Sequence, residues 1–166
     1  MEEILIVDGY NLLNAWEEMA PFADISLEAA RERMIHLLDN YGAFQGVRVI
    51  LVFDGRGTGR AETVLRGQTE VVFTPESQTA DSFIESLTAD LAGRFRVSVV
   101  TSDYEEQKSV FGSGAVRISS REFAALVRHS KSRETGHYRD ASGQLNYLDG
   151  RLDGRIREIL DRKRKS

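Results

Sequence analysis

Three strand-length apolar runs of this chain are each followed by an aspartate. They are residues 4–7 before Asp8, residues 49–53 before Asp54, and residues 97–101, which precede Asp103 by one residue. Short runs rich in β-branched residues are typical of strands buried on both faces, as in parallel sheets covered by helices. If the three strands are parallel, their carboxyl ends meet at one edge, where open α/β sheets bind their ligands. The runs therefore predict an α/β protein with an acidic sheet edge.

Amphipathic segments alternate with these runs. Apolar residues at three- to four-residue spacing follow Ser26, Thr79 and Ser119, and each of these residues suits a helix N-cap. A further short strand is expected at residues 70–74 and a last helix at residues 151–165, whereas residues 55–67 and 131–150 are polar and glycine-containing, as in loops. This order predicts an α/β fold, a three-layer α/β/α domain with a mainly parallel sheet.

Composition places the chain among ordinary globular proteins. Its 166 residues suit one domain, and 41% hydrophobic and 29% charged residues are typical values. The net charge of −4 neither indicates nor excludes nucleic-acid binding, because a local basic patch can act within an acidic chain. An acidic start without a signal sequence, and the lack of any long apolar segment, lead us to expect a cytoplasmic protein with no membrane partner.

A fourth aspartate, Asp81, falls in the first turn of the helix expected after Thr79. A lone aspartate in such a place is most often a helix cap or a turn residue. The repetition at three strand ends instead favours a shared site, because clustered carboxylates repel one another unless a cation joins them. A hard divalent cation with oxygen ligands is the expected partner, since the chain has no cysteine and its three histidines are scattered.

Motifs of other α/β enzymes are missing. Residues 55–60 carry two glycines of a dinucleotide-binding turn but have Arg60 in place of the third, and no phosphate-binding P-loop or G-x-S-x-G elbow occurs. An aspartyl-phosphatase motif would need a second acid at position 10, which is Tyr10. These classes of enzyme are therefore not favoured.

Five stretches, taken in order, resemble the YacP-type members of the NYN domains, a branch of the PIN-like metal-dependent nucleases. The resemblance runs from residue 4 to residue 130 and is carried by residues 7–11 (Val-Asp-Gly-Tyr-Asn), 52–54, 79–81, 101–107 and 111–115. We accordingly expect residues 1–130 to form the nuclease domain, with residues 131–166 a polar loop and a basic helix packed on or extending it.

The resemblance implies an endoribonuclease that uses Mg²⁺ or Mn²⁺, acts on RNA, chiefly messenger RNA, and has the ribosome as a suggested partner. It assigns catalysis to Asp8, Asn11, Asp81 and Asp103, and it places Asp54 with Asp8, Asp81 and Asp103 at the metal. Asn11 would orient the site. Cleavage by metal-activated water would leave a 5′-phosphate and a 3′-hydroxyl. Some relatives carry one more acid where this chain has Ser82.

Cationic and aromatic residues near the expected site are candidates for RNA contacts. They are Tyr10, Arg56, Arg60, Arg66, Lys108, Arg117 and Arg121. The basic residues after position 150 are a further RNA contact or a positive helix end that suits the helix dipole. Two alternatives stay open, a catalytically silent RNA- or ribosome-binding module and a metal-dependent phosphatase for small phosphoesters.

Overall fold

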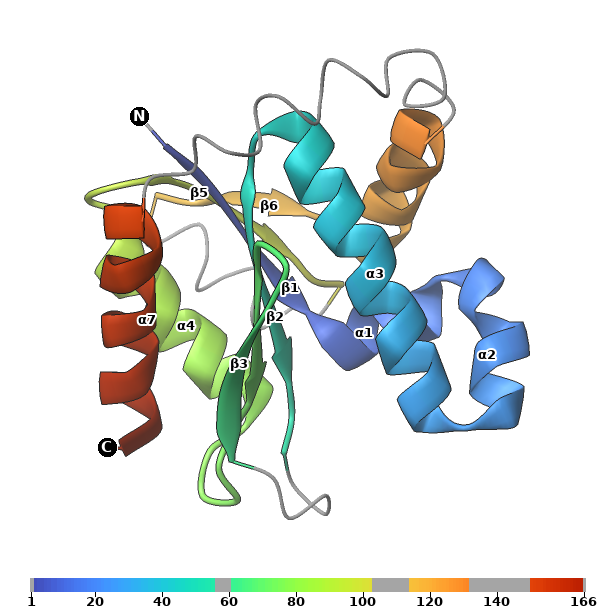
Figure 1. The fold of residues 1–166 in the computed structure, drawn as a ribbon, viewed down its shortest axis with the longest axis horizontal. Coiled ribbons are helices and arrows are strands. Elements are labelled where there is room, and N and C mark those ends of the chain that lie inside the picture. Colours follow the sequence, from blue (N-terminus) through green and yellow to red (C-terminus); the bar gives the residue numbers. More distant parts are fainter. Residues whose placement is uncertain (1, 56–60, 103–113, 132–149, 166) are drawn as a thin grey trace.

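The computed structural model describes residues 2–55, 61–102, 114–131 and 150–165 (Figure 1). The strands are β1 (Glu3–Asp8), β2 (Arg48–Phe53), β3 (Glu62–Arg66), β4 (Thr69–Phe73), β5 (Arg96–Val100) and β6 (Val116–Ile118). The helices are α1 (Gly9–Ala15), α2 (Ala20–Ile25), α3 (Leu27–Gln45), α4 (Ala80–Leu91), the helix of residues 120–131 and α7 (Gly150–Lys165), with a 3-10 turn η1 (Glu17–Met19). No helix in these ranges is long and apolar enough to cross a membrane.

The six strands form one sheet in the order β3-β4-β2-β1-β5-β6. All neighbouring pairs are parallel except β3 with β4. The central strand β1 pairs with β2 on one side and β5 on the other, which aligns Val7 with Leu51 and with Val100. The predicted mainly parallel sheet is thus confirmed, and its carboxyl ends share one edge, called here the carboxyl edge.

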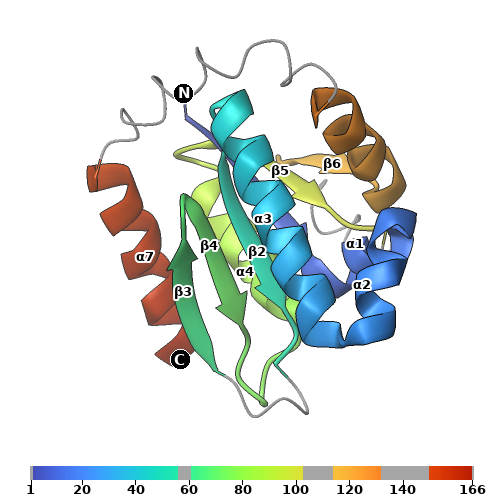
Figure 2. The ribbon, with the colours of Figure 1, turned by 45° about the vertical axis from the view of Figure 1, so that its right-hand side comes forward.

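Helices cover both faces of the sheet, which confirms the three-layer architecture. On β1, Ile4 and Ile6 pack in one core with α4 and α7, whereas Leu5 and Val7 pack in the other core with α1, α3 and the helix of residues 120–131. Figure 2 shows α3 in front of the sheet and α4 behind it. This alternation follows from the two-residue period of a strand, and it decides toward which helical layer each residue at a strand end points.

The predicted helix starts have the expected side-chain caps. Ser26 Oγ accepts a hydrogen bond from the Ala29 N–H at 2.9 Å, and Thr79 Oγ1 accepts one from the Ser82 N–H at 3.1 Å. At the other end of α3, Gly46 has φ 69°, a left-handed conformation that favours glycine and turns the chain toward β2. Local sequence signals therefore set the ends of these helices.

Two edge strands and two short helices differ from the prediction. Residues 55–67 were expected to form a loop, but β3 occupies Glu62–Arg66, and β6 was not predicted at all. Both strands lie at the sheet edges, where one side is open to solvent and the apolar pattern is weak. The helices α1 and α2 between β1 and Ser26 were also missed.

The helix α7 packs against the sheet through apolar side chains and an ion pair with a buried carboxylate. Ile156 and Leu160 are fully buried in the same core as Ile4 and α4. Arg157 Nε lies 3.4 Å from Oε1 of Glu70, whose side chain is inaccessible to solvent. Burial raises the pKa of the Glu70 carboxyl, and the positive charges of Arg157 and Arg48 oppose this rise. Since Glu70 lies near the start of β4, this pair is at the amino edge of the sheet, opposite the carboxyl edge.

Candidate active site

Asp8 lies at the carboxyl end of the central strand and is only 7% exposed. Asp8 is two residues after Ile6 and four after Ile4 on β1, so its side chain points to the same face of the sheet as theirs, toward the layer that contains α4. Asp8 is also the N-cap of α1, and its Oδ1 accepts a hydrogen bond from the Asn11 N–H at 3.4 Å. The cap and the metal-site roles are compatible, because a carboxylate has acceptor capacity beyond one such bond.

Gly9 lets α1 begin directly after Asp8. A Cβ atom at this position would lie 2.5 Å from ring atoms of Phe53 and 3.0 Å from the carbonyl oxygen of Val52. The start of α1 therefore passes close over the end of β2, and only glycine fits there. This close approach gives a physical reason for glycine in the Asp-Gly-Tyr-Asn sequence.

Asn11 joins three elements at the carboxyl edge. Its Oδ1 accepts hydrogen bonds from the Ser102 N–H at 2.9 Å and from the Ser120 hydroxyl at 2.5 Å. The Ser102 hydroxyl in turn accepts a bond from the Ser120 N–H at 3.2 Å. Because a backbone N–H can only donate, the oxygen of the Asn11 amide must face Ser102. Asn11 thereby ties α1 to the end of β5 and to the helix of residues 120–131.

Asp54 follows β2 directly and is half-buried. On β2, Ile50 and Val52 face the α4 layer, so Asp54 continues on the same side as Asp8. The next residue, Gly55, donates its N–H to Oγ1 of the buried Thr74 at 3.0 Å. This bond fastens the chain just after Asp54 to the end of β4.

Asp81 lies in the first turn of α4, and its side chain is exposed. The helix starts after the carboxyl end of β4 and packs on β1, β2 and β5. The N-terminus of α4 therefore lies at the carboxyl edge, on the face toward which Asp8 and Asp54 point. A helix N-terminus also favours negative charge by its dipole.

The donor chemistry at this edge fits a hard divalent cation. Within the described ranges, no three acidic or histidine side chains are close enough together to form a complete metal-binding group. Asp103, the fourth expected acid, lies outside those ranges. Mg²⁺ commonly binds proteins through one or two carboxylates, with water and substrate phosphate as its other ligands. The buried carboxylate of Asp8 suits this mode, with Asp54 and Asp81 on the same face.

Two predicted RNA-contact residues lie near this edge. Arg117 is on β6 beside Val99, which places it on the α4 face of the sheet, and Arg121 is exposed in the first turn of the helix that follows β6. Arg66 was expected near the site. It lies instead at the amino edge, because β3 runs antiparallel to β4 and Arg66 pairs with Thr69. Its guanidinium forms two hydrogen bonds with Glu32, at 3.0 and 2.6 Å.

Of the other residues predicted to contact RNA, Tyr10 packs within the domain, and the remaining three lie outside the described residues. The Tyr10 ring packs against the Phe53 ring with centroids 5.0 Å apart and planes tilted by 55°, and its hydroxyl accepts a hydrogen bond from Arg31 at 3.2 Å. Tyr10 thus contributes to packing on the α3 side of the sheet. Arg56, Arg60 and Lys108 lie outside the described residues.

Several cations of the basic last helix bind within the domain. Besides the Arg157–Glu70 pair, Lys163 forms an ion pair with Asp90 at 2.5 Å, and Arg164 donates to the carbonyl oxygen of Ala61 at 3.2 Å. These contacts fasten α7 to α4 and to the start of β3. The side chains of Arg155 and Lys165 are outside the described part.

Sequence reasoning missed the residues that position the acids. Neither Ser102 nor Ser120 nor the buried Thr74 was predicted to belong to the site. Ser120 follows the capping residue Ser119 and has no local signal of its own, because its partner, Asn11, is 109 residues away in the sequence.

Comparisons with known proteins give one consistent match. A protein-family model described as "YacP-like NYN domain" matches residues 5–165. The uncharacterized protein YacP of Bacillus subtilis (strain 168) is 36% identical over 165 residues, which span 97% of this chain and 85% of that protein. The crystal structure of Rae1 (YacP) from Bacillus subtilis matches with a TM-score of 0.69 and 33% identity, over 98% of this chain and 95% of that one. The crystal structure of a mutant of that protein matches with a TM-score of 0.71 and the same identity, over 98% and 92%.

Proposed function

Because the chain belongs to the YacP-like NYN family, whose domains are of the nuclease type, we propose that it is a metal-dependent endoribonuclease. Its substrate is RNA, chiefly messenger RNA in the cytoplasm, and the products carry a 5′-phosphate and a 3′-hydroxyl. The observation that carries the proposal is the position of Asp8, a buried carboxylate at the end of the central strand of the sheet. Removing a carboxylate from water is costly, and a bound cation offsets that cost.

Asp8 would hold the metal together with Asp81 and Asp103, and Asp54 would complete the ligands directly or through water. A bound Mg²⁺ or Mn²⁺ supplies an activated water and neutralises charge on the phosphoryl oxygens. Asn11 acts as a positioning residue, since its amide oxygen fixes α1 against the end of β5. The side-chain nitrogen of Asn11 has two N–H groups with which to orient a carboxylate or the scissile phosphate.

Arg117 and Arg121 are the described cations that would meet the RNA backbone at this edge. Guanidinium groups suit this role because they bind phosphate oxygens in a bidentate manner. Arg56, Arg60 and Lys108 would extend the contact surface, whereas Arg66 contributes to the pairing of β3 with α3 and not to this site.

The test is an RNA cleavage assay with purified protein and end-labelled RNA. Cleavage should require Mn²⁺ or Mg²⁺, stop with a chelator and resume when metal is restored. The new ends should be 5′-phosphate and 3′-hydroxyl. Cleavage in the presence of chelator, or cyclic phosphate ends, would contradict a metal-activated water as the nucleophile.

The same assay separates the alternatives. RNA binding without cleavage under every metal condition would identify a silent binding module, and hydrolysis of small phosphomonoesters without RNA cleavage would identify a phosphatase. A parallel arm with ribosomes tests the ribosome as a partner. Cleavage that requires ribosomes would show that the partner presents the RNA to the site.

A further inference from the structure

The strand β3 lies at the margin of the sheet. It pairs with β4 on one side, and none of the described strands lies on its other side. Figure 2 shows β3 at this margin, with α7 next to it. Two of its apolar side chains, Val64 and Leu65, are each 37% exposed. Because an edge strand with exposed apolar residues is a template for pairing with another chain, β3 is a surface on which a partner can be sought.

The backbone of β3 has hydrogen-bonding groups that point away from β4. Residues 67–68 form a two-residue hairpin turn, and Gly67 has φ 62°, which suits its first central position. Arg66 and Thr69 are therefore the closing hydrogen-bonded pair of this hairpin. Since bonding alternates along an antiparallel strand, the N–H and C=O groups of Thr63 and Leu65 point outward. No residue in the described part of the chain bonds to these outward groups, so they can pair with a further strand.

The charges of β3 are complementary to those of a second, antiparallel β3. The strand reads Glu-Thr-Val-Leu-Arg, with an acid at one end and a base at the other. If two copies pair about Val64, Glu62 of each copy lies opposite Arg66 of the other. Thr63 then lies opposite Leu65, so the outward backbone groups of the two copies meet as hydrogen-bonded pairs. Parallel pairing in the same register would instead place like charges opposite each other, which is unfavourable.

The side chains of Glu62, Val64 and Arg66 form one row on the α3 side of the sheet, because Val64 pairs with Val71, which packs in the core on that side. The row lines an open cavity of 120 Å³ between β3 and α3, so α3 does not cover it. Arg66 binds Glu32 through Nη1 and Nη2. A guanidinium has five N–H donors, so Arg66 can keep this pair and also bind Glu62 of a second copy.

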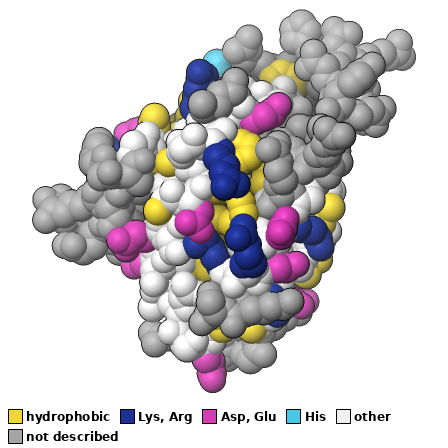
Figure 3. Space-filling view, turned by 90° about the vertical axis from the view of Figure 1, so that its left-hand side faces the viewer, with side chains coloured by type: hydrophobic (Ala, Val, Ile, Leu, Met, Phe, Trp, Pro, Cys, Tyr) yellow, Lys and Arg dark blue, Asp and Glu magenta, His cyan; other side chains and the backbone are white. Residues whose placement is uncertain are grey.

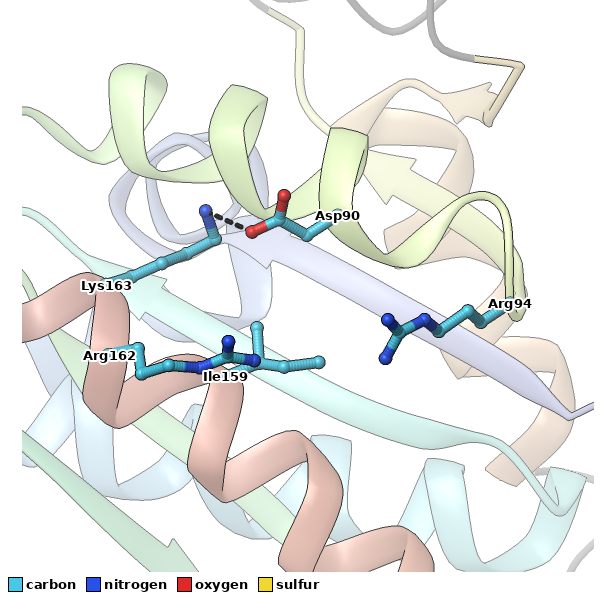
Figure 4. A pocket seen from close by; sticks show the side chains of 5 residues that line it. All are labelled: Asp90, Arg94, Ile159, Arg162 and Lys163. Atoms are coloured by element: carbon cyan, nitrogen blue, oxygen red, sulfur yellow. Dashed lines mark ion pairs between the residues drawn. The ribbon is translucent and has the colours of Figure 1, made fainter.

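The other face of the sheet beside β3 carries α7. Figure 3 shows the side of the molecule on which α7 lies, where Lys and Arg side chains gather between Asp and Glu side chains. One ion pair of this surface, between Lys163 and Asp90, joins α7 to α4 (Figure 4). A surface that carries both signs of charge does not repel a second copy as a surface of one sign would.

We propose that two copies of this chain associate by antiparallel pairing of β3 with β3, which joins their two sheets into one. The interface is isologous, because each copy contributes the same strand about a two-fold axis near Val64. Since the paired strands run in opposite directions, the two carboxyl edges face opposite ways, and the proposed active site of each copy stays open. The inference depends on the strand and its charges and not on the proposed function.

The first experiment measures the mass of the full chain by sedimentation velocity over a series of concentrations. The mass should move from one chain toward two as the concentration rises. Glu62→Arg and Arg66→Glu each place like charges opposite in both ion pairs of the interface, so each should weaken association about tenfold. Asp24→Arg, which reverses an exposed charge on α2, is the control and should leave association unchanged. Thermal unfolding of each variant verifies that the fold is retained.

A mixture of the two charge-reversal variants separates the interface from other effects of the substitutions. In a mixed pair, the two bases of the Glu62→Arg protein meet the two acids of the Arg66→Glu protein. The equal mixture should therefore associate more strongly than either variant alone. A loss of association caused by damage to the fold would not be restored by mixing.

Cross-linking tests the position of the two-fold axis. The chain has no cysteine, so Val64→Cys introduces one thiol in each copy. Opposite residues at a non-hydrogen-bonded position have Cα atoms about 4.5 Å apart, a distance that a disulfide can span. Mild oxidation should therefore give a covalent dimer of Val64→Cys. Val116→Cys is the control, because Val116 is an exposed valine on β6, at the opposite margin of the sheet.

Four outcomes would each overturn the proposal. They are the mass of one chain at every concentration, equal weakening by Asp24→Arg, a mixture that associates no better than its components, and equal cross-linking at both introduced thiols. All readouts are masses and need neither metal nor RNA. Failure of the cleavage assay therefore leaves them valid, and failure of the association leaves the proposed function untouched.

Discussion

The side chain of Asn11 accepts a hydrogen bond from the backbone N–H of Ser102 at 2.9 Å, although 91 residues separate the two in the sequence. Asn11 belongs to the first helix and Ser102 to the chain just after β5. The bond therefore fixes the helix that begins at Asp8 relative to the segment that leads to Asp103. It makes the position of the acids depend on an amide that carries no charge.

Replacement of Asn11 tests this dependence. Asn11→Ala leaves the Ser102 N–H and the Ser120 hydroxyl without their acceptor, so the free energy of unfolding should fall by about 1–3 kcal/mol. Asn11→Asp keeps oxygen acceptors for both donors and should stay within about 1 kcal/mol of the unchanged protein. Urea unfolding measures both effects. Equal stability of the alanine and aspartate variants would show that the bond is not needed for the fold.

Asp8→Asn separates the capping role of Asp8 from its proposed chemistry. Asparagine is as good an N-cap as aspartate, so stability should change by less than about 0.5 kcal/mol. Cleavage should fall at least about 100-fold, because a proposed metal ligand loses its charge. Asp24→Asn removes an exposed acid from α2 and serves as the control. Retained cleavage by a folded Asp8→Asn protein would remove Asp8 from the site.

Metal binding should stabilise the folded protein through the same residue. With Mn²⁺ at about 100 times its dissociation constant, the free energy of unfolding should rise by about 2.7 kcal/mol. Differential scanning calorimetry should show a higher melting temperature with Mn²⁺ for the unchanged protein and for Asp24→Asn. Asp8→Asn should show little of this increase. A full increase in Asp8→Asn would place the metal elsewhere.

Gly9→Ala should destabilise the protein because the added methyl group meets the Phe53 ring at 2.5 Å. Phe53 also stacks on Phe73, with ring centroids 5.3 Å apart, and has little room to move. The expected loss is about 1–3 kcal/mol in urea unfolding. Gly93→Ala is the control, since a Cβ atom there would have no neighbour within 4 Å. Similar effects at both positions would argue against a close approach at Gly9.

The buried carboxyl of Glu70 should give an unusual pH dependence of stability. Burial raises the pKa of the Glu70 carboxyl above its ordinary value of 4.5. Between pH 4.5 and the pKa in the folded state, the folded protein therefore binds more protons at this group than the unfolded protein does. Stability from this group is therefore lost as the pH rises above 4.5. Relative to Glu70→Gln, the unchanged protein should lose stability through this window in urea unfolding at a series of pH values. Glu85→Gln, which changes an exposed residue of α4, is the control, and its stability should vary with pH as that of the unchanged protein does. The same pH dependence in Glu70→Gln as in the unchanged protein would contradict the expected effect.

The interior of the fold could be predicted because its signals are local. The central strands read as apolar runs, and the apolar run at residues 49–53 lies within β2, which begins one residue earlier at Arg48. The caps at Ser26 and Thr79 mark their helices by side-chain chemistry within three residues. By contrast, β3 alternates little between buried and exposed residues, so its pairing with β4 has no clear pattern in the sequence.

The candidate site could be predicted only in part. Acids at strand ends are visible in the sequence. Once the strands are known, their two-residue period also shows that Asp8 and Asp54 point to the same face of the sheet. The links from Asn11 to Ser102 and Ser120 depend on contacts between distant segments. The pairing of Arg66 with Glu32 likewise depends on the direction of β3, which no motif near Arg66 reveals.

The central place of β1 has a consequence for folding kinetics. β1 is the earliest strand in the sequence, yet its second neighbour, β5, begins at residue 96. Long sequence separation between paired strands slows folding, because a large loop must close before the pairing is gained. Asp8 thus has its final surroundings only after both flanking strands have joined. A partially folded chain would therefore lack the assembled site, so the onset of the proposed cleavage during refolding would report completion of the sheet.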